Sequence, residues 1–216
     1  MQSKSRWVKS EPSLSHEGSI YDYNSVRYSI PLKPRVDAAI NSIDSQVDRL
    51  DLILKNLRSK DDEMFHEALP LVKENKQYSA VFLSELTQIM KTGKIVYLSK
   101  ILLENLKVRL KSVSGIEELV SILSPTIAVV KNIRSSLISH MPDSEDDEIG
   151  VISELLGGIL IDAGQIGNSV INFENANEQA LNLVNEASLT AEQKTQQDFR
   201  NLLKLVPLSS VADEFK

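Results

Sequence analysis

The sequence contains no cysteine and only 3 histidines among its 216 residues. Without cysteine the chain cannot form a disulfide framework, a thiolate nucleophile or a cysteine-ligated zinc site. The histidines, His16, His66 and His140, belong to three different segments, and none has a second ligand at metal-binding spacing. We therefore expect them to be exposed or structural residues.

Motifs of catalytic and phosphate-binding sites are missing as well. The glycine-containing stretch LLGGILIDAGQIG (155–167) lacks the G-x-x-x-x-G-K-[ST] pattern of a phosphate loop and does not follow a strand. G-x-S-x-G and H-E-x-x-H are also absent. The acidic run DSEDDE (143–148) lacks the glycine of a calcium loop and is interpreted as a solvated linker. These absences predict a protein that is not an enzyme and has no cofactor or metal.

Long apolar runs are lacking too. No uninterrupted run approaches the roughly 20 residues that span a bilayer. The N-terminal sequence MQSKSRWVKSEPSLSHEGS has no apolar signal-peptide core, so we expect a cytoplasmic protein. Glycine, proline and aromatic residues are few, while Leu, Ile, Ser, Glu and Lys are abundant, which favours an all-α fold of long helices.

Positive charge is scarce in the second half of the chain. Residues 1–111 contain 18 Lys and Arg against 14 Asp and Glu, whereas residues 112–216 contain 6 against 16. Two halves of opposite charge can attract each other, or the basic half can face an anionic surface. Because the cations are dispersed among acids and the pI is 5.2, nucleic acid is not an expected partner.

The sequence does have long helical patterns. The stretch 34–60 places apolar residues at alternating spacings of four and three, which predicts a helix from Pro34 that Pro70 kinks or ends. The polar residues 73–77 are expected to form a tip before a second long helix over 78–112, which gives an antiparallel hairpin. The apolar seam of the first helix consists of Val36, Ile40, Ile43, Val47, Leu50, Leu54 and Leu57.

Shorter helices are expected after the hairpin, over residues 114–141. Ser114 and Glu117 match a capping box, and Ser124 with Pro125 predicts the start of a further helix. An acidic linker (142–148) precedes an apolar helix at 149–162. Glycines inside that helix cost about 1 kcal/mol each relative to alanine, so it is predicted to depend on docking and to be detachable. Residues 163–216 are expected to form a tail with weak helices near 175–188 and 191–205.

The middle of the second long helix is apolar on two sides, so one neighbouring helix cannot cover it. We expect it to pack in the hairpin on one side, and against helix 149–162 or a neighbouring subunit on the other. The residues assigned to this assembly and autoinhibition surface are Ile95, Leu98, Ile101, Leu102, Leu106, Ile149, Ile152, Leu155, Leu156 and Ile159.

The first 33 residues have no periodicity and are predicted to form a flexible basic and aromatic arm. Within the arm, Lys4, Arg6 and Lys9 surround Trp7. A tryptophan among cations suits a membrane interface, where each cation near anionic lipid adds about 1 kcal/mol. The alternative is an ordinary basic tail.

The order of these segments resembles the archaeal CdvB proteins, the cell-division relatives of ESCRT-III. The resemblance covers roughly residues 34–162 and rests on LENLKVRL (103–110), ILSPTIAVVKNIRSSL (122–137) and SELLGGI (153–159). It implies a subunit that polymerises with itself and with paralogous subunits into membrane-associated filaments. These would constrict and cut membrane at the division site, on the inner face of the membrane, while the acidic C-terminal region restrains assembly.

The resemblance also implies an ATPase of the AAA class that remodels the subunits through a leucine motif in the tail. The nearest match is RNLLKLVPLSS (200–210), with one proline where the family motif has two. Its motif residues are Leu202, Leu203, Leu205, Pro207 and Leu208. The chain is similar to the shorter members of the family. The alternative function is a helical coiled-coil adaptor that does not polymerise.

Overall fold

The computed structural model describes residues 31–74, 76–141, 148–167 and 173–199. In this part of the chain the regular structure is entirely helical, as the composition predicted. The helices are α1 (Leu32–Glu74), α2 (Lys76–Ser112), α3 (Ile116–His140), α4 (Glu148–Gly167) and α5 (Phe173–Asp198).

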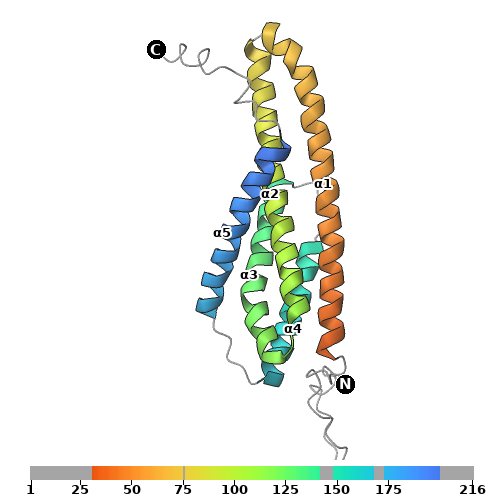
Figure 1. The fold of residues 1–216 in the computed structure, drawn as a ribbon, viewed down its shortest axis with the longest axis vertical. Coiled ribbons are helices and arrows are strands. Elements are labelled where there is room, and N and C mark those ends of the chain that lie inside the picture. The colour runs from red at the N-terminus through yellow and green to blue at the C-terminus, as the bar shows by residue number, and fades with distance from the viewer. Residues whose placement is uncertain (1–30, 75, 142–147, 168–172, 200–216) are drawn as a thin grey trace, which may run out of the picture.

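Helices α1 and α2 form the long antiparallel hairpin that the sequence predicted (Figure 1). They have 43 and 37 residues, or about 64 and 55 Å at 1.5 Å per residue. Lys100 Nζ lies 2.6 Å from Asp51 Oδ1, and Lys107 Nζ lies 2.5 Å from Asp44 Oδ1. Both pairs keep one antiparallel register. The tip is shorter than predicted, because the residues on either side of residue 75 already belong to the two helices.

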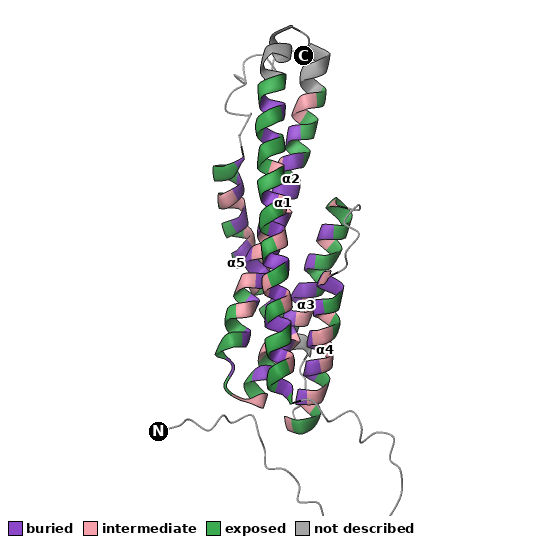
Figure 2. Ribbon diagram, turned by 90° about the vertical axis from the view of Figure 1, so that its right-hand side faces the viewer, coloured by how far each residue is buried: buried purple, intermediate pink, exposed green. Residues whose placement is uncertain are grey.

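The seam of α1 points into the molecule. Leu57 is half-buried, and the other six seam residues from Val36 to Leu54 are buried. Because α2 lies along this seam, the spacing that suggested a partner helix is satisfied within the chain. Figure 2 shows the buried residues following the inner sides of the helices.

Two prolines do not end helices as the sequence suggested. Pro70 lies inside α1, and Pro125 lies inside α3, which is one helix of 25 residues rather than two shorter ones. A proline removes one helical hydrogen bond, but its fixed φ is itself compatible with a helix. Burial of Leu119, Leu123 and Val129 on either side of Pro125 offsets that loss.

The start of α3 also differs from the prediction. Gly115 is the N-cap residue, and Glu118 rather than Glu117 makes the capping contact. The backbone N–H of Ser114 donates to Glu118 Oε2 over 2.8 Å, and the Ser114 hydroxyl donates to the same oxygen over 2.9 Å. These two hydrogen bonds lower the pKa of Glu118 below its ordinary 4.5. With the cap one residue later, the glutamate at the third helical position is residue 118.

The remaining two helices lie on opposite sides of the hairpin (Figures 1 and 2). Helix α4 packs chiefly on α3 and α1, and α5 packs on α2 and α3. By length and composition alone α4 could cross a membrane. In the structure it instead has one side buried in the bundle, through large residues such as Ile152, Leu156 and Ile159.

Candidate assembly surface and its intramolecular cover

The apolar middle of α2 is covered within the chain. Ile101, Leu102 and Leu106 are buried, and Ile95 and Leu98 are half-buried. Besides α1, the helices that pack on α2 are α3 and α5. The sequence had predicted that either helix 149–162 or a neighbouring subunit would provide this cover, and the structure bears on the first alternative. That expectation was wrong about the helix, because α4 lies chiefly on α3 and α1.

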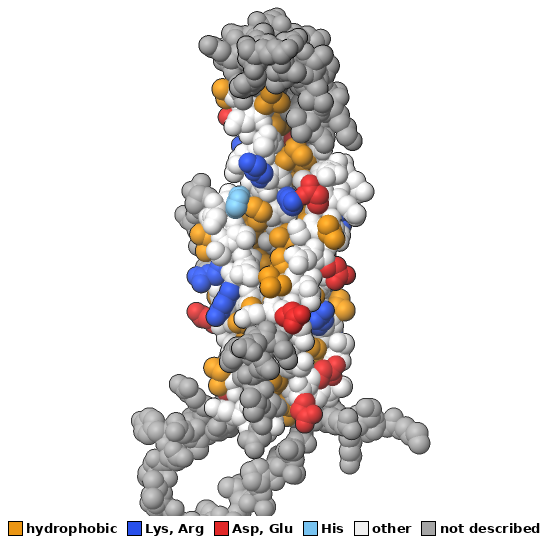
Figure 3. All heavy atoms as spheres, turned by 90° about the vertical axis from the view of Figure 1, so that its left-hand side faces the viewer, with side chains coloured by type: hydrophobic (Ala, Val, Ile, Leu, Met, Phe, Trp, Pro, Cys, Tyr) orange, Lys and Arg blue, Asp and Glu red, His pale blue; other side chains and the backbone are white. Residues whose placement is uncertain are grey.

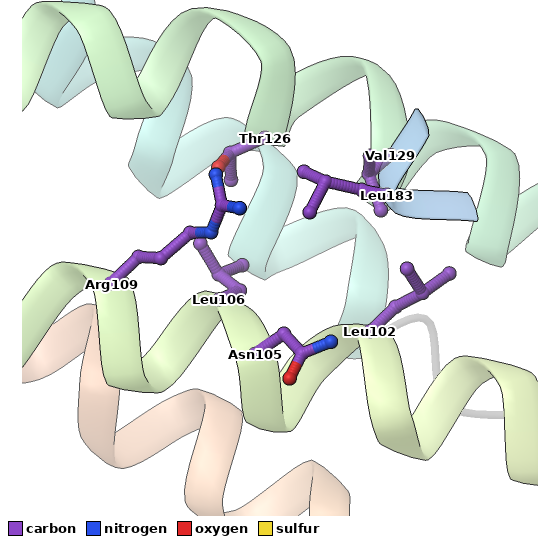
Figure 4. Close-up of a pocket in the computed structure, with 7 residues that line it drawn as sticks. All are labelled: Leu102, Asn105, Leu106, Arg109, Thr126, Val129 and Leu183. Carbon is purple, nitrogen blue, oxygen red and sulfur yellow. The ribbon is translucent and has the colours of Figure 1, made fainter. Parts of the chain in front are cut away.

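A small cavity marks the place where α2, α3 and α5 meet (Figure 4). Leucine and valine side chains from all three helices point into it, and Arg109 extends beside Thr126 at its edge. The cavity measures about 10 Å³, which is room for about one water molecule. This site therefore holds a packing defect and not a ligand pocket. Its lining residues are Leu102, Asn105, Leu106, Arg109, Thr126, Val129 and Leu183.

The end of α5 is seated on a glycine of α2. Phe199 follows the helix, its N–H donates to Thr195 O over 3.0 Å, and its side chain is 2% exposed. A Cβ added to Gly93 would lie 2.6 Å from two carbon atoms of the Phe199 ring. Only glycine at this position lets the ring lie so close to the α2 backbone. The contact between Gly93 and Phe199 is called the phenylalanine seat below.

Polar contacts surround the phenylalanine seat. The Tyr97 hydroxyl donates to Asp198 and accepts from Arg58, and Arg58 also pairs with Asp198. One turn away Lys94 pairs with Glu192. Lys194 and Arg58 lie 5.9 and 5.7 Å from the centre of the Tyr97 ring, within cation–π distance.

These contacts shift the pKa values of groups that take part in them. Burial raises the pKa of Tyr97 above its ordinary 10.0, and the hydrogen bond to Asp198 adds to this, while Arg58 lowers it. The pKa of Glu192 lies below its ordinary 4.5, chiefly because Lys94 donates a hydrogen bond to its carboxylate. At neutral pH, Tyr97 therefore keeps its proton and Glu192 its charge, as both contacts require.

The predicted residues of α4 form a separate surface. Ile149, Ile152, Leu156 and Ile159 are buried, and Leu155 is half-buried. They do not join the α2 residues in one continuous surface, because α4 lies on α3 and α1.

Charged residues at both ends of α4 pair with α1. Arg49 Nη1 lies 2.7 Å from Glu148 Oε1, and Arg35 pairs with Asp162. The basic hairpin thus binds both acidic helices that follow α3. Residues of α1 pair with α4, and residues of α1 and α2 pair with α5.

Sequence reasoning missed the face of α5 that covers α2. The buried residues of this face are mostly alanines, which the hydrophobic pattern did not single out. The signal was present, because Ala176, Ala180, Ala187, Ala191 and Thr195 fall on one side of a helix. On the outside α5 leaves Leu181 and Leu189 exposed, and Figure 3 shows hydrophobic side chains between charges of both signs on that side of the molecule.

Several predicted sites lie outside the described residues. These are the arm residues Lys4, Arg6, Trp7 and Lys9, and the tail residues Leu202, Leu203, Leu205, Pro207 and Leu208. Among the described residues, no three His, Asp or Glu side chains are placed to hold a metal ion. The prediction that the protein is not an enzyme stays a prediction.

The proteins similar to this chain include two from Sulfolobus acidocaldarius. Cell division protein B1 is 28% identical over 173 residues, which are 80% of this chain and 80% of the relative. Cell division protein B is 23% identical over 163 residues, which are 75% of this chain and 60% of the relative. No protein-family model and no solved structure matches the chain.

Proposed function

Because the chain belongs to the CdvB family of archaeal cell-division proteins, we propose that it is an ESCRT-III-like subunit that polymerises on membranes. The described structure is then the closed, unassembled form, in which α5 covers the apolar side of α2. In the open form a neighbouring subunit takes the place of α5. The two occupants compete for one surface, and their relative affinities set the fraction of subunits that assemble.

The observation that carries the proposal is the difference between the buried faces of α4 and α5. Helix α4 buries large side chains, among them Ile152 and Leu156. Among its described residues, α5 buries mainly alanines, and Phe199 at its end is the one large side chain that is buried. A buried methyl group contributes about 0.8 kcal/mol, whereas a buried Ile or Leu contributes about 1.5–3 kcal/mol. The releasable element is therefore α5 rather than α4.

Exposed ion pairs also contribute to the docking of α5. Contacts such as Lys94–Glu192 and Arg58–Asp198, with side chains 35–44% exposed, hold α5 in place. Exposed ion pairs contribute about 0.2–1 kcal/mol each and weaken as salt is added. An anionic membrane surface that attracts Lys94 or Arg58 would compete with these carboxylates. Membrane binding and release of α5 are thereby coupled.

Gly93→Ala tests the proposal without shortening the chain. The new Cβ pushes the Phe199 ring away, while the change from glycine to alanine stabilises the α2 helix itself by about 1 kcal/mol. We expect the full-length variant to sediment as polymers with anionic vesicles at a lower protein concentration than the unaltered chain. A chain that ends at residue 167 should do so at a still lower concentration.

The matched control is Gly157→Ala, which makes the same chemical change where a Cβ meets no atom within 4 Å. Gly157→Ala should leave unchanged the protein concentration at which polymers sediment with vesicles. If Gly93→Ala and the truncated chain both remain small, fixed oligomers at all concentrations and salts, the protein is a helical adaptor and not a polymerising subunit.

The partners follow from this function. They are further copies of the chain, paralogous subunits, the anionic inner face of the membrane at the division site, and an ATPase of the AAA class that acts on the tail. The arm residues around Trp7 supply the first membrane contact, and residues 202–208 supply the ATPase motif. The B1 relative matches this chain over 80% of both lengths, which agrees with a shorter member of the family.

A further inference from the structure

A hollow lies at the end of the bundle where α4 ends and α3 begins. Its volume is about 510 Å³, and it is lined by residues 114–118 and by Ile166 and Gly167. Pockets that hold small organic groups measure about 300–1,000 Å³. Ile166 is 41% exposed, so this end of α4 presents an apolar side chain that the described residues do not cover. The hollow is large enough for one aromatic side chain.

The lining combines apolar and acidic groups. Ile116 and Ile166 provide apolar surface, and Glu117 and Glu118 provide carboxylates. The last turn of α4 contains no basic residue, and the C-terminal end of a helix carries a partial negative charge. A ligand that joins an aromatic ring to several cations would satisfy both parts of this lining.

The start of α1 lies at the same end of the bundle as the hollow. The pairs Arg35–Asp162 and Arg49–Glu148 hold α1 and α4 antiparallel, with the same spacing of 14 residues along each helix. The first turn of α1, which begins at Leu32, therefore lies beside the last turn of α4. Residues 1–30 are therefore joined to the bundle at the end where Ile166 lies.

We propose that the N-terminal arm of the same chain docks in this hollow, with the Trp7 ring between Ile116 and Ile166. The cations Lys4, Arg6 and Lys9 then face Glu117 and the end of α4. Docking withholds Trp7 from the membrane until lipid competes for it. Only this last consequence rests on the proposed function.

The arm is long enough to reach the hollow, and its tether favours docking within one molecule. Trp7 and Pro31 are 24 residue steps apart in the sequence, and a random-coil linker of that length spans about 27 Å. A tether of this kind gives an effective concentration of about 1 mM. A contact with a Kd of about 0.1 mM is then occupied in about 90% of molecules, whereas a second copy at micromolar concentration occupies the hollow far less.

Trp7 is the chain's single tryptophan, so the fluorescence of the unlabelled full-length protein reports its environment directly. Without lipid, we expect blue-shifted emission and acrylamide quenching about two- to tenfold weaker than for the peptide 1–30. Ile166→Asp and Glu117→Lys should each restore peptide-like quenching. Ile161→Asp is the matched control, because Ile161 is 59% exposed on the same helix but does not line the hollow.

Three results would overturn the inference. The first is that acrylamide quenches Trp7 as strongly in the full-length protein as in the peptide. The second is that the protection of Trp7 from quenching persists in Ile166→Asp. The third is that this protection appears only as the protein concentration rises. The last result would assign the hollow to the arm of a second copy. Circular dichroism of each variant shows that the bundle is intact. The quenching experiment contains no vesicles and measures no assembly. Its failure therefore does not bear on the assembly test with Gly93→Ala, and failure of that assembly test does not bear on docking of the arm.

Discussion

At the scale of single residues, three glycines in helices differ in what surrounds them. Gly93 gives the Phe199 ring access to the α2 backbone. At Gly158 a Cβ would lie 3.0 Å from Arg35 Nη2, so this glycine makes room for the guanidinium that pairs with Asp162. Gly157 has no such neighbour. Packing thus explains why a glycine, which weakens a helix, stands at positions 93 and 158. Nothing in the structure explains the glycine at position 157.

Alanine substitutions at the two adjacent glycines of α4 should separate these roles. Gly157→Ala is expected to raise the free energy of unfolding by up to about 1 kcal/mol, because alanine favours the helix and meets open space. Gly158→Ala should raise the free energy of unfolding by clearly less, since Arg35 must shift away from its partner Asp162. Urea unfolding of both variants measures the difference. Equal gains would mean that the Arg35 contact does not depend on Gly158.

At the scale of elements, α4 and α5 differ in how they are held. Helix α4 relies on large apolar side chains with ion pairs at its two ends. Helix α5 relies on small side chains, exposed ion pairs and the phenylalanine seat. Electrostatic contacts therefore make up a larger share of the docking free energy of α5, and conditions that change charge should act on α5 first.

Acid should weaken the docking of α5 through Glu192. Because its pKa is lowered in the folded protein, the contact with Lys94 adds stability above the ordinary pKa of 4.5, and this stability is lost as pH falls through the folded pKa. We expect the stability gap between the unaltered chain and Glu192→Gln to narrow from pH 6 to pH 3. The pair is half-exposed, so the gap should stay below about 1 kcal/mol.

Urea unfolding at a series of pH values measures this gap. Glu178→Gln, at an exposed position of the same helix, is the control. A gap that is independent of pH, or one as large for Glu178→Gln, would contradict a role of Glu192 in docking.

On the scale of the whole molecule, the hairpin is longer than the helices that cover it. Helix α5 ends where Asp198 contacts Arg58 and Tyr97, and α4 begins beside Arg49. Beyond these contacts α1 and α2 continue as a two-helix extension (Figure 1). Two helices alone bury less apolar surface per residue than the bundle, so local opening should need less free energy there.

Hydrogen exchange should follow this division. We expect amides of residues 61–67 and 81–90 to exchange faster than those of residues 96–110, where α3 and α5 also pack on α2. Mass spectrometry of the full-length protein at fixed pH measures this. Equal protection along the hairpin would mean that its two ends open as one unit.

The local patterns of the sequence were enough to predict the hairpin. The alternating spacing from Val36 to Leu57 reports which side of α1 is apolar, and a short polar break indicates an antiparallel neighbour. The stretches 34–60 and 78–112 were therefore predicted as helices, and the structure places both in the hairpin. The charge difference between the halves left two possibilities, attraction within the chain or an anionic surface that faces the basic half, and Arg49–Glu148 and Lys94–Glu192 are contacts of the first kind.

The tertiary structure decided where local and long-range preferences compete. Pro125 favoured a break, but burial of its neighbours made α3 one helix. The strongly apolar α4 was one of two expected covers for α2, beside a neighbouring subunit, yet within the chain the alanine face of α5 lies there instead. For the hairpin, sequence alone determined which residues form helices and which sides are apolar, because these depend on neighbours in the chain. Which apolar sides meet depends on the shapes of surfaces far apart in sequence, and only the folded bundle brings those surfaces together.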